Sequence, residues 1–140
     1  MAMSTMIFVN LPVESLNRSI DFYSKLGFTF NPQFTDEHTT CMIVSDTIFV
    51  MLLENVRFAE FTSKAIIDAH THVETLNALM FDERDRVDEL MELALAAGAR
   101  EPVPAQDHAF MYARQFEDLD GHTWDVGWMD PSTLDAPPAG

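Results

Sequence analysis

The sequence predicts an α+β protein built from two βαβββ modules, whose paired and mostly antiparallel sheets form a cleft. Two observations predict this fold. A strand-like run, an amphipathic helix and a glycine occur in that order in each half of the chain, and further strand-like sequence follows each glycine. Hydrophobic residues make up 47% of the 140 positions, which suffices for a core. We therefore expect one structural domain, with modules at 4–53 and 73–129, a linker at 54–72 and a loose tail at 130–140.

The first module opens with a strand at Met6–Leu11, which we expect Pro12 to end because proline lacks the N–H that a ladder needs. Ser15 then provides an N-cap for a helix. The apolar residues of this helix recur at helical spacing: Leu16, Ile20 and Tyr23. Gly27 supplies the left-handed turn that ends it.

Three more strands complete the first module. The sequence predicts a strand at Phe28–Phe34 and then a tight hairpin of Thr39–Ser45 with Thr47–Leu53. The linker that follows has no clear hydrophobic period, and a short helix fits within it.

The second module repeats this order. We expect a strand at Val73–Phe81, a helix from Asp85 to Ala97 ended by Gly98, and strands at Arg100–Val103, Phe110–Glu117 and Thr123–Met129. Alternation along the last strand puts Trp124, Val126 and Trp128 on one face. Asp125 then faces the opposite way, into the cleft, if the tryptophans pack on the helix.

Charge limits the classes of partner. The chain has 23 acidic against 8 basic residues, and its formal net charge is −15. Such a field repels nucleic acid and anionic lipid, and it attracts cationic ligands. No apolar run approaches the roughly 20 residues of a membrane span. We expect a cytoplasmic protein, since no signal peptide is evident and the single cysteine cannot form an internal disulfide.

Two segments resemble a known superfamily. Residues 8–28, with Asn-Leu-Pro-Val followed by Phe-Tyr and Leu-Gly-Phe, resemble the opening of the vicinal oxygen chelate superfamily. Residues 116–125, Phe-Glu-Asp-Leu-Asp-Gly-His-Thr-Trp-Asp, resemble its closing strand pair. This superfamily contains glyoxalase I, the bleomycin-resistance proteins and the extradiol dioxygenases. The likeness spans about residues 4–130, and the chain looks most like the branch labelled predicted lactoylglutathione lyase.

The resemblance implies a divalent metal held from four strands, but the corresponding positions here are mostly apolar. They fall on Phe8, near Met51, near Leu76 or Ala78, and on Asp125. Apolar side chains cannot hold such an ion, and one carboxylate is not a site. We therefore expect no metal and no cofactor, although a divalent metal stays an alternative. A shifted register would turn Glu74 toward the cleft in place of Leu76, which gives only two carboxylates.

Asp125 is the candidate catalytic residue, either a general base or an anchor for a cation. The alternative is an edge-strand acid in water. Tyr112 and Arg114 share a strand face, where the guanidinium fork could grip an anion or could pair with a structural acid. Phe8, Asn10, Met51 and Leu76 are the other candidate ligand-binding residues, as an apolar lining with one polar amide.

The histidines are weaker candidates. His70 and His72 resemble a pair of metal ligands, but no nearby third ligand has a clear register. His108 and His122 are expected in loops, where His108 could shuttle a proton at a cavity rim.

The first functional hypothesis is a resistance-type protein that binds a small organic ligand in an apolar, acid-rimmed cleft. The alternative is an enzyme that acts as a lactoylglutathione lyase or isomerase with Asp125 as base. The resemblance also implies a homodimer, and one cleft could be closed by one chain or by two.

Overall fold

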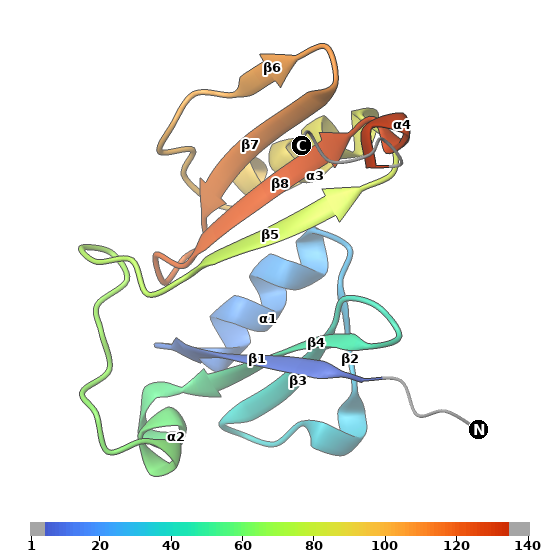
Figure 1. Cartoon of the computed structure of the whole chain (residues 1–140). Coiled ribbons are helices and arrows are strands. Elements are labelled where there is room, and N and C mark those ends of the chain that lie inside the picture. The colour runs from blue at the N-terminus through green and yellow to red at the C-terminus, as the bar shows by residue number, and fades with distance from the viewer. Residues whose placement is uncertain (1–4, 135–140) are drawn as a thin grey trace. The chain divides into compact units, whose positions relative to one another are not determined.

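A computed structural model of the chain describes residues 5–134, and it confirms the α+β class (Figure 1). The chain forms two compact units, one ending at Asp68 and the other beginning at Ala69. Each unit contains a four-stranded sheet and one long helix. In each sheet one strand pair is parallel and two are antiparallel.

The first unit has the strand order β1-β4-β3-β2, with β1 and β4 parallel. Its elements are β1 (Ile7–Val13), α1 (Leu16–Lys25), β2 (Thr29–Phe30), η1 (Pro32–Phe34), β3 (Thr39–Ile43), β4 (Ile48–Glu54), α2 (Asn55–Phe58) and η2 (Ala59–Phe61).

The second unit has the strand order β5-β8-β7-β6, with β5 and β8 parallel. Its elements are β5 (Leu76–Phe81), α3 (Asp85–Ala96), β6 (Gln106–His108), β7 (Met111–Glu117), β8 (Thr123–Met129) and α4 (Pro131–Leu134).

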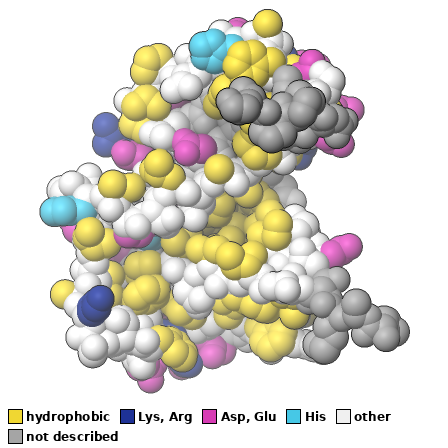
Figure 2. All heavy atoms as spheres, in the orientation of Figure 1, with side chains coloured by type: hydrophobic (Ala, Val, Ile, Leu, Met, Phe, Trp, Pro, Cys, Tyr) yellow, Lys and Arg dark blue, Asp and Glu magenta, His cyan; other side chains and the backbone are white. Residues whose placement is uncertain are grey.

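One face of each sheet is buried against its helix. In the first unit Leu11 and Leu52 of the sheet are buried, as are Leu16, Phe22 and Tyr23 of α1. Alternation then turns the intervening side chains of β1 and β4 to the other face, which we call the open face. Hydrophobic side chains gather over this sheet in Figure 2, and Phe8 on the open face is 43% exposed.

In the second unit the buried face contains Phe116, Trp124 and Val126, together with the inward side chains of α3. Phe116 and Trp124 are register partners, and their rings stack with centroids 6.3 Å apart. The predicted alternation along β8 is confirmed, because Trp124 packs on the helix side. Asp125 therefore lies on the open face of this sheet.

Both helices end as predicted, at glycines with φ of 100° for Gly27 and 110° for Gly98. The Ser15 hydroxyl accepts the Arg18 N–H at 3.3 Å, which confirms the N-cap of α1. The expected end of the first strand at Pro12 is wrong, because β1 continues to Val13. An edge strand has only one neighbour, so it tolerates proline.

Several predicted strands are shorter or displaced. The strand expected at Phe28–Phe34 stops at Phe30, and Pro32 begins a 3-10 turn instead. The strand expected at Val73–Phe81 begins only at Leu76. Prolines 102 and 104 lack the N–H of a ladder, so the strand expected at Arg100–Val103 is replaced by one isolated bridge, and β6 forms later.

The expected loose tail begins with a helical turn, since the Asp130 carboxylate accepts the N–H and the hydroxyl of Ser132. Residue 4 of the predicted first module and residues 135–140 of the tail lie outside the described residues.

Candidate functional site

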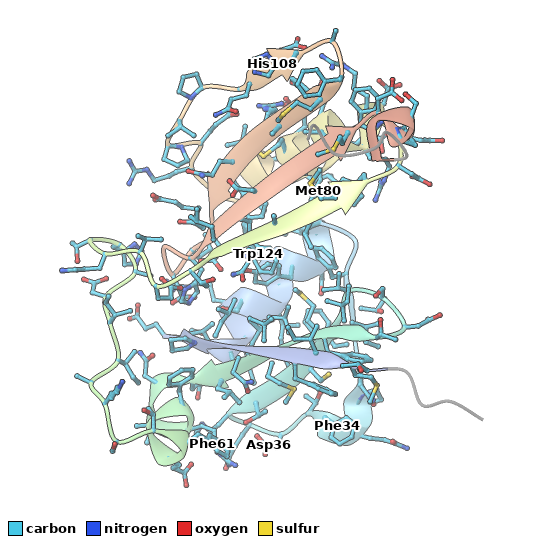
Figure 3. The ribbon with its side chains drawn as sticks, in the orientation of Figure 1. Phe34, Asp36, Phe61, Met80, His108 and Trp124 are labelled. Atoms are coloured by element: carbon cyan, nitrogen blue, oxygen red, sulfur yellow. The ribbon has the colours of Figure 1, made fainter. Side chains whose placement is uncertain are left out.

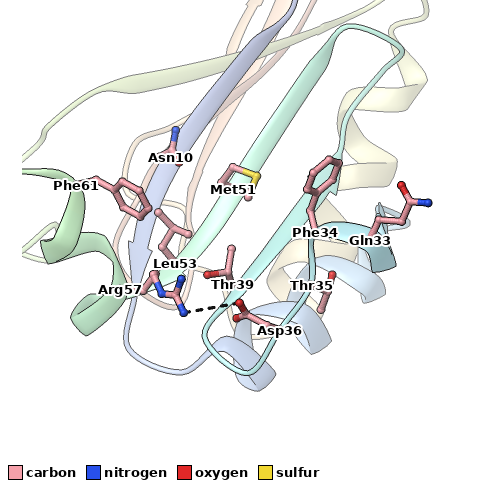
Figure 4. Close-up of a pocket in the computed structure, with 10 residues that line it drawn as sticks. All are labelled: Asn10, Gln33, Phe34, Thr35, Asp36, Thr39, Met51, Leu53, Arg57 and Phe61. Carbon is pink, nitrogen blue, oxygen red and sulfur yellow. Dashed lines mark ion pairs between the residues drawn. The ribbon is translucent and has the colours of Figure 1, made fainter.

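A pocket of about 360 Å³ lies on the open face of the first unit (Figure 4). Its floor is formed by the strands and its two walls by the segments around η1 and η2. The lining residues are Asn10, Gln33, Phe34, Thr35, Asp36, Thr39, Met51, Leu53, Arg57 and Phe61.

Strand register builds the floor. Asn10 pairs with Met51 across β1 and β4, and Thr39 pairs with Leu53 across β3 and β4. Register partners point to the same face of a sheet, so these four side chains face the pocket together. Asn10 and Met51, both expected to bind the ligand, are thereby brought together. The Asn10 amide donates to the Phe8 carbonyl oxygen at 3.1 Å.

Two phenylalanines form the walls. Phe34 is 56% exposed and Phe61 is 73% exposed. Figure 4 shows their rings on opposite sides of the pocket, with Met51 between them, and Figure 3 places both on one side of the first unit. Sequence reasoning missed both, because it assigned Phe34 to a strand and Phe61 to the linker. The signals that could have found them are the proline turn next to Phe34 and the charged residues around Phe61.

One buried polar atom in the pocket lacks a hydrogen-bond partner among the described residues, the Thr39 hydroxyl oxygen. A buried hydroxyl without a partner costs about 1 to 3 kcal/mol relative to a paired one. A ligand atom that hydrogen-bonds to Thr39 would remove this cost.

A charged pair closes one end of the pocket. The Asp36 carboxylate accepts the His38 N–H at 2.8 Å, and its other oxygen lies 3.7 Å from a terminal nitrogen of Arg57. The His38 N–H and then the Arg57 charge hold the pKa of Asp36 below its ordinary value. Arg57 also contacts Glu60, with 3.1 Å between Nε and Oε2.

Phe8 lies on the same open face, where its ring stacks on Phe49 with centroids 4.8 Å apart. It does not line the pocket defined above.

In the second unit, Asp125 lines a separate pocket of about 280 Å³. The amide of Gln115, its register partner on β7, donates to its carboxylate at 2.7 Å. On the other side its register partner is Ala78, while Leu76 pairs with Thr123. Leu76 is exposed on the edge strand β5.

Tyr112 and Arg114 lie on the opposite face of this sheet from Asp125, against α3. The Arg114 guanidinium donates to both oxygens of Glu101 at 2.8 and 2.9 Å, and to Asp88 at 2.8 Å. The Tyr112 hydroxyl donates to the same Asp88 at 2.7 Å. These contacts match the structural alternative for Arg114. Arg114 also borders the Asp125 pocket, but its guanidinium is already engaged by carboxylates.

The carboxylates around Arg114 raise its pKa further above its ordinary value, with the Glu101 hydrogen bonds as the largest cause. The Tyr112 hydrogen bond, followed by the Arg114 contact, lowers the pKa of Asp88. The pKa of Tyr112 is raised, first by burial and then by Asp88.

The positions that the resemblance assigns to a metal do not fit a divalent ion. Phe8, Met51, Leu76 and Ala78 offer no oxygen or nitrogen side-chain ligand, and only Asp125 does. Within residues 5–134, no three His, Cys, Asp or Glu side chains are grouped to hold a metal ion. Glu74 precedes β5, and its carboxylate contacts His122.

The histidines fall into different settings. His72 contacts the Thr71 hydroxyl at 2.8 Å on the surface. The expectation of a loop for His108 is wrong, because His108 is the last residue of β6, where its ring stacks on Phe110. His122 lies outside the strands, as expected, but it is almost fully buried, with Nδ1 2.6 Å from Glu74. The sequence does not reveal this partner, which lies 48 positions away.

Comparisons with known proteins agree with this architecture. A family model described as bleomycin resistance protein-like N-terminal matches residues 5–45. A hypothetical protein from S. aureus, SA1046, is 26% identical with a TM-score of 0.75, over 91% of this chain and 95% of that one. No curated protein sequence matches the chain.

Two further solved structures share the fold. A glyoxalase-related enzyme from Fulvimarina pelagi has a TM-score of 0.74 at 19% identity, covering 90% of this chain and 88% of that one. A glyoxalase/bleomycin resistance protein/dioxygenase family enzyme from Burkholderia phytofirmans has a TM-score of 0.72 at 15% identity, covering 90% and 99%.

The two βαβββ units thus have the glyoxalase/bleomycin-resistance fold. The family match, taken with this fold, supports the vicinal oxygen chelate superfamily. Among the helices of residues 5–134, none has the length and apolar character that a membrane span requires.

Proposed function

We propose that the chain binds a small, flat organic molecule in the pocket of the first unit, as a resistance-type binding protein. The observation that carries the proposal is the pair of exposed rings, Phe34 and Phe61, on opposite walls of a pocket whose floor includes Met51. An aromatic ligand between them would remove both rings from water. Each ring contact contributes about 0.5 to 1.5 kcal/mol beyond the area buried.

The floor supplies shape and one directional contact. Met51 is a flexible and polarizable side chain that adapts to a ring laid over it. The Thr39 hydroxyl offers a hydrogen bond that no described residue uses. An apolar pocket with a few polar groups is the usual form of a small-molecule site.

The matched family segment supports the same reading. Residues 5–45 include Asn10, Phe34, Asp36 and Thr39 of the pocket lining. The family description names bleomycin resistance, and we transfer from it only the class of function, sequestration of an organic compound.

Fluorescence titration with acridine, a neutral flat aromatic, tests the proposal. We expect saturable binding, which Phe34→Ala and Phe61→Ala each weaken by roughly threefold to tenfold. Phe110→Ala is the matched control, since Phe110 is similarly exposed at 51% but lies in the other unit. No saturable binding, or equal losses in all three variants, would refute the proposal.

A lyase or isomerase reaction with Asp125 as base is the second candidate. It is supported by the pocket that Asp125, Gln115 and Gln106 line in the second unit. Turnover of a hemithioacetal, measured with and without added nickel or zinc, tests it directly. Turnover that Asp125→Asn abolishes would favour the enzyme over the binding protein.

A further inference from the structure

We infer that Arg57 competes with the ligand for the Asp36 carboxylate. The pocket therefore selects flat aromatic cations, which replace Arg57 beside Asp36. This inference rests on the proposed function and adds the charge of the ligand to it.

The Asp36 carboxylate has two contacts, one short and one long. One carboxylate oxygen accepts the His38 N–H at 2.8 Å, which fixes the side chain at the pocket end. The other oxygen faces Arg57 at 3.7 Å, a separation that is too long for a hydrogen bond. Exposed pairs of this kind contribute little to stability, so a ligand can replace the guanidinium at small cost.

Arg57 has a second acidic partner, Glu60. Its Nε lies 3.1 Å from Glu60, one turn further along the same segment. Arg57 can therefore leave Asp36 and keep an ion-pair partner. Displacement leaves no uncompensated charge behind, which is the condition for an exchange of cations on one carboxylate.

The surroundings of Arg57 disfavour an anionic ligand. An anion would have to approach Arg57, but Asp36 and Glu60 already flank its guanidinium. Both carboxylates would repel the anion. Two further acids lie beside His38 at this end of the pocket, Glu37 and Glu54. The basic groups there are Arg57 and His38. The local field thus favours a cation, as does the net charge of −15.

The Asp36 carboxylate and the two phenylalanine rings line the same pocket. Phe34 and Phe61 present aromatic faces or edges on both sides of the pocket, and Asp36 lies at one end of it. A cationic ring system gains from the quadrupoles of aromatic neighbours as well as from the carboxylate. A neutral ring of the same shape gains only the stacking.

The test compares three ligands of one shape in mildly alkaline buffer: cationic proflavine, neutral acridine and anionic acridine carboxylate. We expect proflavine to bind roughly tenfold tighter than acridine, and the carboxylate to bind weakest. Asp36→Asn should remove most of the difference, because asparagine can keep the turn to His38 but has no charge. Glu37→Gln is the control, since it removes one charge at the next position, where the side chain is 85% exposed.

Two variants test the competition itself. Arg57→Gln should tighten proflavine binding severalfold, because the competitor is gone. Glu60→Gln should weaken it by a similar factor, because Arg57 then has only Asp36 as partner. A contact that merely holds the α2 segment in place would make Arg57→Gln weaken all three ligands equally. Circular dichroism spectra of each variant confirm that it is folded.

The outcomes separate the two proposals. If acridine binds but proflavine is not tighter, or if Asp36→Asn behaves as Glu37→Gln does, the charge inference is wrong and the pocket remains. If no ligand of the three binds, the proposed function itself is wrong. If Arg57→Gln weakens proflavine, competition by Arg57 is refuted.

Discussion

Oε1 of Glu54 lies 2.6 Å from Nδ1 of His38, while the other oxygen of Glu54 accepts the Leu16 N–H at the start of α1. One carboxylate therefore ties the end of β4 to the residue before β3 and to the first turn of the helix. Its hydrogen bonds, first from His38 and then from Leu16, lower the pKa of Glu54. The Glu54 contact is the largest cause that raises the pKa of His38.

This pair predicts a window of maximal stability. His38 contributes fully below the ordinary histidine pKa of 6.5, and its contribution is lost as the pH rises through the raised value. Glu54 contributes above the ordinary glutamate pKa of 4.5, and its contribution is lost as the pH falls through the lowered value. The pair should therefore stabilise the protein most between these two ordinary values.

Melting temperatures of wild type and Glu54→Gln across the acidic and neutral range measure this effect. The difference between the two proteins should be largest within the window. Glu14→Gln, at an exposed surface acid, should give a flat difference. A Glu54→Gln difference that is independent of pH would contradict the assignment.

Arg114 should be a structural residue of the second unit. Its side chain is 13% exposed, and it donates two parallel hydrogen bonds to Glu101. Arg114→Lys keeps the charge but loses the fork, so we expect it to cost about 1 to 3 kcal/mol of unfolding free energy. Urea denaturation gives this value.

Arg86→Lys is the matched control, because Arg86 forms an exposed pair with Glu89 at 3.1 Å. It should change stability by less than about 0.5 kcal/mol. Acridine affinity should be the same in both variants. An unchanged stability together with weakened ligand binding in Arg114→Lys would restore Arg114 as a ligand-binding residue.

Gly121 should tolerate no side chain. Its φ is 87°, and a Cβ there would lie 2.7 Å from backbone atoms of Ala69 and His70. Gly121→Ala must therefore strain its own backbone and move a neighbouring one, which we expect to cost more than about 2 kcal/mol. Thermal or urea unfolding measures the loss.

Gly27→Ala separates the two causes, because Gly27 has a φ of 100° but open space where a Cβ would lie. Its cost should be only the roughly 1 to 2 kcal/mol of the left-handed conformation. Equal losses at both glycines would show that the close approach of Ala69 is unimportant.

A homodimer stays a prediction, and light scattering should give a mass twice that of the chain. The edge strands β1 and β5 carry exposed apolar side chains, among them Ile7, Leu76 and Met80. Such edges invite association with a partner. Leu76→Lys should shift the equilibrium toward monomer, and a monomeric wild type at all concentrations would contradict the prediction.

Much of the fold can be read from local patterns. The alternation along β8 correctly separates Trp124 from Asp125, because side chains of a strand must point to opposite faces. Ser15 and Gly27 mark the ends of α1 through backbone chemistry that neighbours hardly alter. The predicted strand end at Pro12 was wrong, because the effect of proline on a strand depends on whether that strand lies at the edge of its sheet. The tertiary structure decides this.

The candidate site was only partly predictable. Asn10 and Met51 were expected, since strand alternation puts them on an open face. Phe34 and Phe61 were missed, because they stand in irregular segments whose side-chain directions no periodicity fixes. For Arg114 the sequence left two alternatives, an anionic ligand or a structural acid, since it does not show that α3 brings Asp88 to β7.

The sequence by itself determined the order of strands and helices, the apolar faces of the sheets and the acidic charge, because these follow from periodicity, backbone conformation and composition. Only the tertiary structure decided which side chains meet. The pocket between Phe34 and Phe61, the contact of Arg57 with Asp36 and the burial of His122 beside Glu74 each join segments that lie apart in the chain. Such contacts depend on strand register and on the path of loops, and no single stretch of residues specifies either.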